Sequence, residues 1–249
     1  MTTTIQPARK RKKASPTAGP SLRAGPFGHS GSGAVTQLLT DRQRQQLAAV
    51  AASLRLPSGT SLYEQQSQAG SIWIVDSGVV KSWRILADGK RQVTAFLFAG
   101  DLFGLAENGH YVNSTKSVTA VTLYRIAVNV LTDILRRDPE LEFQFLCKMA
   151  HELRELQRRS IIVGRRDAPG RLAMFIAMLA REQTGTDVTS HTIPVPMSRM
   201  DIAEFLDLTP EAVSRATRRL KTDGIAIFQN RHAVRIVDRD RFEQLVGSV

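Results

Sequence analysis

Residues 196–237 read PMSRMDIAEFLDLTPEAVSRATRRLKTDGIAIFQNRHAVRIV, and this stretch decides the fold of the chain. Ser198 is a residue type that caps helix N-termini well, and Asp201 stands three residues later as its acidic capping partner. Apolar residues then recur at helical spacing, at Ile202, Ala203 and Leu206. The pattern predicts a first helix that begins after Ser198.

The residues that follow indicate a second helix. Asp207 and Leu208 fit a tight turn, and Thr209 is a favourable N-cap. Pro210 suits the first turn of a helix because no backbone hydrogen bond is lost there, and Gly224 is a residue type that commonly ends a helix. The second helix is therefore expected over roughly residues 210–223.

One face of this second helix is suited to packing and the other to DNA. The packing face carries Val213, Ala216, Thr217 and Leu220. Arg can bond both acceptors of a guanine, Glu can accept from a cytosine or adenine amine, and Ser can serve either way. We therefore predict that the other face reads bases in a major groove through Glu211, Ser214 and Arg215. Backbone or additional DNA contacts are predicted at Ser198, Thr209, Arg218, Arg219 and Lys221.

A β-hairpin is expected after the second helix. Ile225 to Phe228 and Ala233 to Val237 alternate enough in polarity to be strands, and Gln229 to His232 supply a polar turn. Together these elements predict a winged helix-turn-helix within residues 167–249. The alternative is an ordinary αα-hairpin with a charged solvent face.

Residues 197–215 resemble the DNA-binding signature of the CRP/FNR family of bacterial transcription regulators, and most closely its FNR/FixK-like branch. In that branch a Glu-x-x-Ser-Arg motif reads bases, and it matches Glu211, Ser214 and Arg215 here. The resemblance implies a palindromic DNA site of the TTGAT-N4-ATCAA type, read by a homodimer that contacts RNA polymerase. It also implies an α+β fold with a cyclic-nucleotide-binding-like β-roll (jelly roll) and a long dimerisation helix before the winged helix-turn-helix.

A β-roll is independently indicated over residues 34–130. Short apolar runs are punctuated by glycines there, and strands are expected, for example, at Ile72 to Asp76, Val79 to Leu86 and Arg91 to Phe98. Residues 100–104, Gly-Asp-Leu-Phe-Gly, resemble the entrance to the family's phosphate loop. A generic antiparallel domain, such as a cupin-like jelly roll, is the alternative.

A long helix and a hinge are expected over residues 131–166. Asp138 is an N-cap followed by a first-turn proline, and the helix should run to about Val163. Apolar residues at heptad spacing predict a dimer interface, although the helix could instead pack on its own domain. The interface residues are Leu146, Met149, Leu153, Leu156, Ser160 and Val163. Gly164 to Gly170 should break the helix, and Gly170 should open an amphipathic helix to about Gln183.

The first 33 residues form a basic tail. They carry 6 of the net +11 charges of the 249-residue chain and no acidic residue, whereas residues 168–249 supply only +1. Such a composition cannot bury a core, so residues 1–33 are expected to be disordered. The tail could add salt-sensitive attraction to DNA, or it could be a solubilising or misannotated leader.

No known effector of the family fits the sequence well. Leu105 stands where cyclic-AMP-binding members have a Glu, and only Lys116 offers a cation in the later part of the loop. Cys147 is the single cysteine, which excludes an iron-sulfur cluster within one subunit and leaves redox control through Cys147 as an alternative. His110 and His151 leave haem as another, and an unidentified ligand of the β-roll as a third. We expect no cofactor and no metal.

The chain lacks the common catalytic motifs, and so an enzyme is not expected. No Gly-x-Ser-x-Gly, paired-histidine metal motif or phosphate-cradling Lys-Ser or Lys-Thr loop is present. No apolar run approaches the length of a membrane span, and no apolar segment follows the basic tail. A cytoplasmic protein without a membrane partner is expected.

Overall fold

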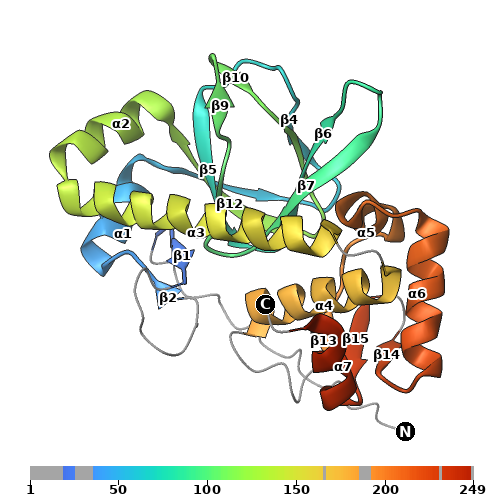
Figure 1. Cartoon of the computed structure of the whole chain (residues 1–249). Helices are drawn as coiled ribbons and strands as arrows, with labels where there is room; N and C mark the ends of the chain where they lie inside the picture. Colours follow the sequence, from blue (N-terminus) through green and yellow to red (C-terminus); the bar gives the residue numbers. More distant parts are fainter. Residues whose placement is uncertain (1–18, 26–35, 165–166, 185–191, 230–231, 248–249) are drawn as a thin grey trace, which may run out of the picture.

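A computed structural model describes residues 19–25, 36–164, 167–184, 192–229 and 232–247. A β-roll and a winged helix-turn-helix are joined by a long helix that runs across the middle of the molecule (Figure 1). The expected α+β architecture is confirmed.

The β-roll consists of two four-stranded antiparallel sheets. One sheet has the order β4-β11-β6-β7, with bounds Ser61–Tyr63, Ser114–Ser117, Val80–Ile85 and Arg91–Leu97. The other has the order β3-β12-β5-β8, with bounds Ala52–Leu56, Val121–Ala127, Ser71–Ser77 and Leu102–Phe103. A small ribbon pairs β9, Ala106–Glu107, with β10, His110–Tyr111. The three strands that the sequence predicts match β5, β6 and β7 to within one residue at each end.

The turn between β5 and β6 depends on Gly78. Its φ is 86°, a region that favours glycine. A Cβ atom at this position would also lie 2.3 Å from the carbonyl oxygen of Ala120. The Asp-Ser-Gly turn of the sequence is therefore fixed both by backbone conformation and by lack of space.

Three helices flank the roll: α1 (Asp41–Val50), α2 (Val128–Arg137) and α3 (Pro139–Gly164). Helix α3 starts where the sequence predicts, because the Oδ1 atom of Asp138 accepts a hydrogen bond from the backbone N–H of Leu141 at 3.0 Å. Its inner face buries Leu141 and Phe145 against β12 and α1 residues of one core cluster. The sequence analysis did not predict α1 or α2 as separate helices: α1 falls within the expected β-roll, and most of α2 precedes the long helix within residues 131–166.

The connection between α3 and the next helix is shorter than expected. Helix α4, Ala168–Thr184, begins two residues before Gly170. Asp167 provides the reason, because its Oδ2 atom accepts from the N–H of Gly170 at 2.7 Å and so caps the first turn, in which Pro169 costs no hydrogen bond. Residues 168–170, Ala-Pro-Gly, were expected to lie in the break between two helices, but they form the first turn of α4. Residues 165–166 of the expected hinge lie outside the described residues.

The winged domain contains α5 (Arg199–Leu206), α6 (Pro210–Thr222) and α7 (Arg239–Val246). Its sheet has the order β13-β15-β14, with bounds Ile193–Pro194, Ala233–Ile236 and Ala226–Gln229. The two expected wing strands are present, each displaced or shortened by about one residue. Residues 230–231 of the expected turn lie outside the described part of the chain.

A shared core joins the roll to the winged domain. Phe96 of β7, Phe175 of α4 and Phe205 of α5 form a triangle with ring centroids 5.2 to 5.9 Å apart. All three side chains are buried in one continuous apolar cluster. The first helix of the helix-turn-helix is therefore packed on the edge of the roll.

Part of the N-terminal tail is ordered, which corrects the expectation of disorder over residues 1–33. Strand β1, Arg23–Ala24, pairs with β2, Thr36–Gln37. Leu22 and Ala24 are fully buried, and the N–H of Arg23 donates to the carbonyl oxygen of Gly100. Overall composition did not reveal that Leu22 and Ala24 pack into an apolar surface formed by α1, α3 and the Gly100 loop. Residues 1–18 and 26–35 lie outside the described residues.

Candidate nucleic-acid interface

The turn between α5 and α6 is held by side-chain caps at both helix starts. The Ser198 hydroxyl accepts from the N–H of Asp201, and the Thr209 hydroxyl accepts from the N–H of Ala212, each at 3.1 Å. Asp207 ends α5 in the left-handed conformation, with φ 52°. The predicted helix-turn-helix punctuation is confirmed, and it fixes the angle at which α6 leaves α5.

Helix α6 buries one side and exposes the other. Val213, Ala216 and Leu220 are almost completely buried against α4, α5 and the sheet. The opposite side exposes Glu211, Arg215, Arg218, Arg219 and Lys221. In Figure 1 this helix lies at the right-hand edge of the molecule. The predicted separation into a packing face and a free face is present.

Most charged residues of the free face have no partner in the described part of the chain. Within the described part of the chain, no side-chain hydrogen bond or ion pair is made by Glu211, Arg215, Arg218 or Lys221. Unpaired cations and an unpaired carboxylate on one helix face can bond to base edges and phosphates without first breaking a protein contact.

Ser214 differs from Glu211 and Arg215, because it is half-buried and already bonded. Its hydroxyl donates to the carbonyl oxygen of Pro210 at 2.9 Å and accepts from Nη1 of Arg199 at 2.7 Å. Arg199 is therefore a member of this face that the sequence reasoning missed. The signal that could have found it is its position directly after the Ser198 cap, at the N-terminus of α5.

The residues predicted to contact the DNA backbone fall into two groups. Ser198 and Thr209 are exposed at helix N-termini, where free backbone N–H groups favour phosphate. Arg219 pairs with Asp223 at 2.7 Å, but its side chain is 70% exposed, so this pair is weak and exchangeable. The Lys221 side chain is exposed and pairs with no described residue, so it can contact a phosphate.

The acidic residues of α5 face the β-roll instead of solvent. Asp201 forms an ion pair with Lys81 of β6, and Glu204 accepts from Nε of Arg91 of β7 at 2.8 Å. Arg159 of α3 adds hydrogen bonds to the carbonyl oxygens of Val93 and Thr94 at 2.6 and 2.7 Å. The ion pairs of Asp201 and Glu204 hold α5 against the β-roll, and the bonds of Arg159 hold α3 against the same strand, β7.

The inside of the roll is filled by aromatic side chains. Tyr63 stacks on Tyr111 with centroids 3.7 Å apart, and Trp73 and Phe103 lie about 6 Å from Tyr63. A Cβ atom on Gly104 would lie 2.8 Å from Trp73, so the loop expected to receive a phosphate is packed on that ring. Leu105 is exposed and Lys116 is half-buried.

The candidate effector residues are in different environments. Cys147 is buried and free, and it is not among the exposed residues of α3. His110 is exposed and its ring contacts the carbonyl oxygen of Asn108. His151 is buried in α3. The two histidines lie in different parts of the fold, since His110 belongs to β10 at the far end of the roll (Figure 1).

The expected dimer residues divide between an exposed and an inner set. Leu146, Leu153 and Leu156 are 56 to 59% exposed, and Ser160 is also exposed. Met149 and Val163 are half-buried, and Met149 packs against a core cluster. Phe143 and Ile161 are exposed on the same helix and extend the apolar surface beyond the expected interface residues.

Among the described helices, none is long and apolar enough to cross a membrane.

Family models match both halves of the chain. Residues 53–138 match the cyclic nucleotide-binding domain, and residues 170–245 match the Crp-like helix-turn-helix domain. The two matches fall on the β-roll and on the winged domain.

Curated relatives and solved structures agree with these matches. The chain is 32% identical to the nitrogen fixation regulation protein FixK of Azorhizobium caulinodans, over 82% of this chain and 83% of that protein. It is 27% identical to the fumarate and nitrate reduction regulatory protein of Escherichia coli, over 77% of each chain. The structure of FixK2 from Bradyrhizobium japonicum is similar, with a TM-score of 0.71 and 27% identity over 80% of this chain and 99% of that one.

Proposed function

Because the chain belongs to the CRP/FNR family of DNA-binding transcription regulators, in its FixK-like branch, we propose that it is a homodimer that reads a TTGAT-N4-ATCAA-like palindrome. The observation that carries the proposal is the exposed face of α6, on which Glu211 and Arg215 have no partner in the described part of the protein. Binding, and no catalytic step, is its proposed activity, and the cytoplasm is where it meets DNA.

The roles on this face follow from hydrogen-bond chemistry. Arg215 donates to a guanine, and Glu211 accepts from a cytosine or adenine amine. The Ser214 hydroxyl contacts a base edge and also accepts a hydrogen bond from Arg199. Arg199 is thereby placed to contact a neighbouring phosphate or base. Arg218, Arg219 and Lys221 contact phosphates, as do Ser198 and Thr209 at the helix starts.

A second copy of the chain is the partner proposed for α3. Helix α3 has 26 residues and exposes leucines along much of its length. Pairing two such helices about a two-fold axis buries these side chains and presents two α6 helices to successive major grooves, about 34–36 Å apart. RNA polymerase is proposed to contact the β-roll surface or the hinge loops of this dimer.

The dimer is proposed to bind DNA without a small effector. Support comes from the aromatic packing of Tyr63, Trp73 and Tyr111 inside the roll, and from Leu105 at the position of the cyclic-AMP-binding Glu. The burial of Cys147 supports packing over redox sensing for this residue. Gating by Cys147, by haem or by an unidentified ligand is the alternative.

Fluorescence anisotropy of the purified protein on the palindrome and on a scrambled duplex, at one fixed salt concentration, tests the proposal. Tight and selective binding by ligand-free protein is expected. Equal binding to both duplexes would refute the proposed sequence. Selective binding that appears only after an oxidant, haem or a cell extract is added would favour the effector-gated alternative. Sedimentation of the same sample tests the dimer.

A further inference from the structure

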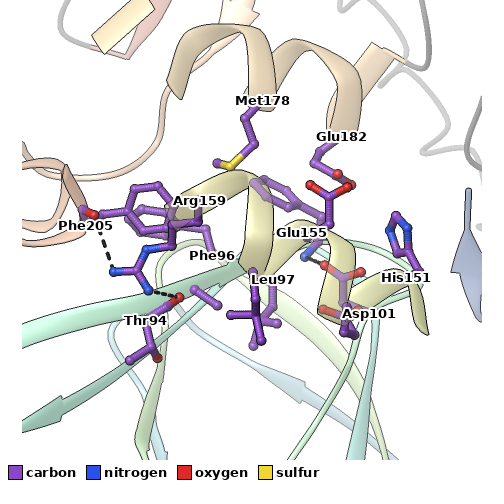
Figure 2. Close-up of a pocket in the computed structure, with 14 residues that line it drawn as sticks. Thr94, Phe96, Leu97, Asp101, His151, Glu155, Arg159, Met178, Glu182 and Phe205 are labelled. Atoms are coloured by element: carbon purple, nitrogen blue, oxygen red, sulfur yellow. Dashed lines mark hydrogen bonds between the residues drawn. The ribbon is translucent and has the colours of Figure 1, made fainter. Parts of the chain in front are cut away.

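A small cavity lies where α3, α4 and the edge of the roll meet. It has a volume of about 70 Å³ and is bordered by His151, Glu155, Arg159, Met178 and Glu182, among others. In Figure 2, Glu182 reaches from α4 toward the part of α3 that carries Glu155 and His151. This volume holds an ion together with one or two water molecules.

Three potential metal ligands converge at this cavity. His151 and Glu155 are four residues apart on α3, and Glu182 comes from α4. One ligand atom from each lies within 4.8 Å of the others. Around a tetrahedral ion with bonds of about 2.0 Å, ligand atoms are about 3.3 Å apart, so side-chain adjustments of roughly an ångström would close the site.

The two carboxylates of this site differ in the partners that they have among the described residues. Glu182 makes no hydrogen bond or ion pair with any described residue. Burial raises its pKa to about 7, and the negative charges of Asp101 and Glu155 act in the same direction. Glu155 does contact Arg158 and Arg181, but a carboxylate has about four lone-pair positions and can still bind a cation.

His151 provides a second, independent indication of a ligand. Its side chain is only 4% exposed, and Nδ1 accepts a long hydrogen bond, 3.3 Å, from the N–H of Gly25. Its other ring nitrogen, Nε2, has no partner among the residues that the structure describes. A ring nitrogen that lines a cavity and bonds to no described residue is available to an ion or to a water molecule that an ion can displace.

We propose that His151, Glu155 and Glu182 bind one divalent first-row transition-metal ion. One imidazole and two carboxylates with room for water form the ligand set of an open three-ligand site, and this mixture suits borderline ions such as Zn²⁺, Mn²⁺ or Fe²⁺. The ion places a positive charge directly beside the Glu182 carboxylate, which has no ion pair with a described residue. It also links α3 of the sensor half directly to α4 of the DNA-binding half.

Metal binding also has a consequence for the N-terminal segment. A neutral imidazole has one nitrogen with a lone pair and one that carries a proton. If Nδ1 binds the ion it loses its lone pair, and if Nε2 binds the ion the proton moves to Nδ1. In both cases the hydrogen bond from Gly25 is broken. The metal and the docked residues 19–25 therefore compete for His151.

Titration of chelator-treated, full-length protein with Co²⁺, followed by its visible absorption, tests the site, and Zn²⁺ in a calorimeter repeats the measurement. One ion per chain is expected. Glu182→Gln should weaken binding by about tenfold or more, since even outer-shell changes cost metal sites 10- to 100-fold. This variant should fold normally, because Glu182 bonds to none of the described residues. The expected increase in amide exchange at residues 19–25 on metal binding is the second readout.

Two matched variants act as controls. Glu142→Gln changes an exposed carboxylate of the same helix, and His110→Ala removes an exposed histidine of the roll. Neither should alter the titration. The proposal is overturned if no ion binds, if binding survives Glu182→Gln, or if it is lost in His110→Ala. Because none of these outcomes depends on DNA, the site and the proposed DNA sequence can fail separately.

Discussion

Helices α5 and α6 belong to one motif but use their charged residues in opposite ways. The acids of α5, Asp201 and Glu204, pair with Lys81 and Arg91 of the roll. On α6, Glu211 and Arg215 are exposed and have no partner in the described part of the chain. The first helix is therefore held by the β-roll, while the second is left available to DNA.

This difference explains how a nearly neutral DNA-binding half can still bind a polyanion. Residues 168–249 carry a net charge of only +1. Several of their acids are turned toward cations of the protein, and so they do not offset the arginines that face outward. Placement of the charges, rather than their sum, decides the sign of the surface that meets DNA.

The largest expected effect comes from a substitution that weakens the packing of α5 on the β-roll. Phe205→Ala removes one ring of the triangle with Phe96 and Phe175, and such truncations of buried Phe cost about 3 to 5 kcal/mol. The free energy of unfolding, measured with urea, should fall by this amount. Ile85→Ala truncates an exposed residue of the roll and should change it by less than about 1 kcal/mol. Equal losses in the two variants would contradict the proposed packing.

The next largest expected effect concerns the exposed face of α6. Arg215→Ala should weaken binding to the palindrome by about 1 to 3 kcal/mol and relax the choice of base at one position in each half-site. The free energy of unfolding should not change by more than about 0.5 kcal/mol, because Arg215 has no protein partner among the described residues. Anisotropy on the palindrome and on single-base variants measures both affinity and selectivity. A uniform loss on all duplexes would assign Arg215 to phosphate.

Helix caps and a first-turn proline made much of the helix-turn-helix predictable from sequence. The caps at Ser198 and Thr209 and the proline at position 210 act over three or four residues, and the structure has them where the sequence places them. Strands β5, β6 and β7 were equally accessible, because turns at fixed glycines separate them. Local rules suffice where the determining contacts are local.

Contacts that cross between domains were not predictable in the same way. The pairing of Arg91 with Glu204 joins residues 113 positions apart, and no spacing rule connects them. Helix α1 was missed because its ten residues contain few apolar side chains and are mainly polar, although Thr40 and Gln43 form a capping box. The order of residues 19–25 and the cluster of His151 with Glu182 likewise depend on surfaces that exist only after folding.

A smaller expected effect distinguishes residues of α6 that contact bases from those that contact phosphates. Lys221→Ala should weaken binding to specific and scrambled duplexes by the same factor, and should lower the slope of log affinity against log salt by about 1 per subunit. Anisotropy at several salt concentrations gives this slope. Arg84→Ala removes an exposed cation of the roll and should leave the slope unchanged. A change in selectivity with Lys221→Ala would mean that this residue contacts a base.

The smallest expected effect tests whether the two helices are independent. Arg91→Ala removes the ion pair with Glu204 and a longer one with Asp201. Because Arg91 is 40% exposed, the free energy of unfolding should fall by only about 0.2 to 1 kcal/mol at low salt and by less at high salt. Arg91 and Arg215 share no partner in the described residues. Their separate effects on DNA affinity should therefore add to within about 0.5 kcal/mol in the double variant. A larger coupling, measured by anisotropy, would mean that the contact of α5 with the roll sets how α6 reads its bases.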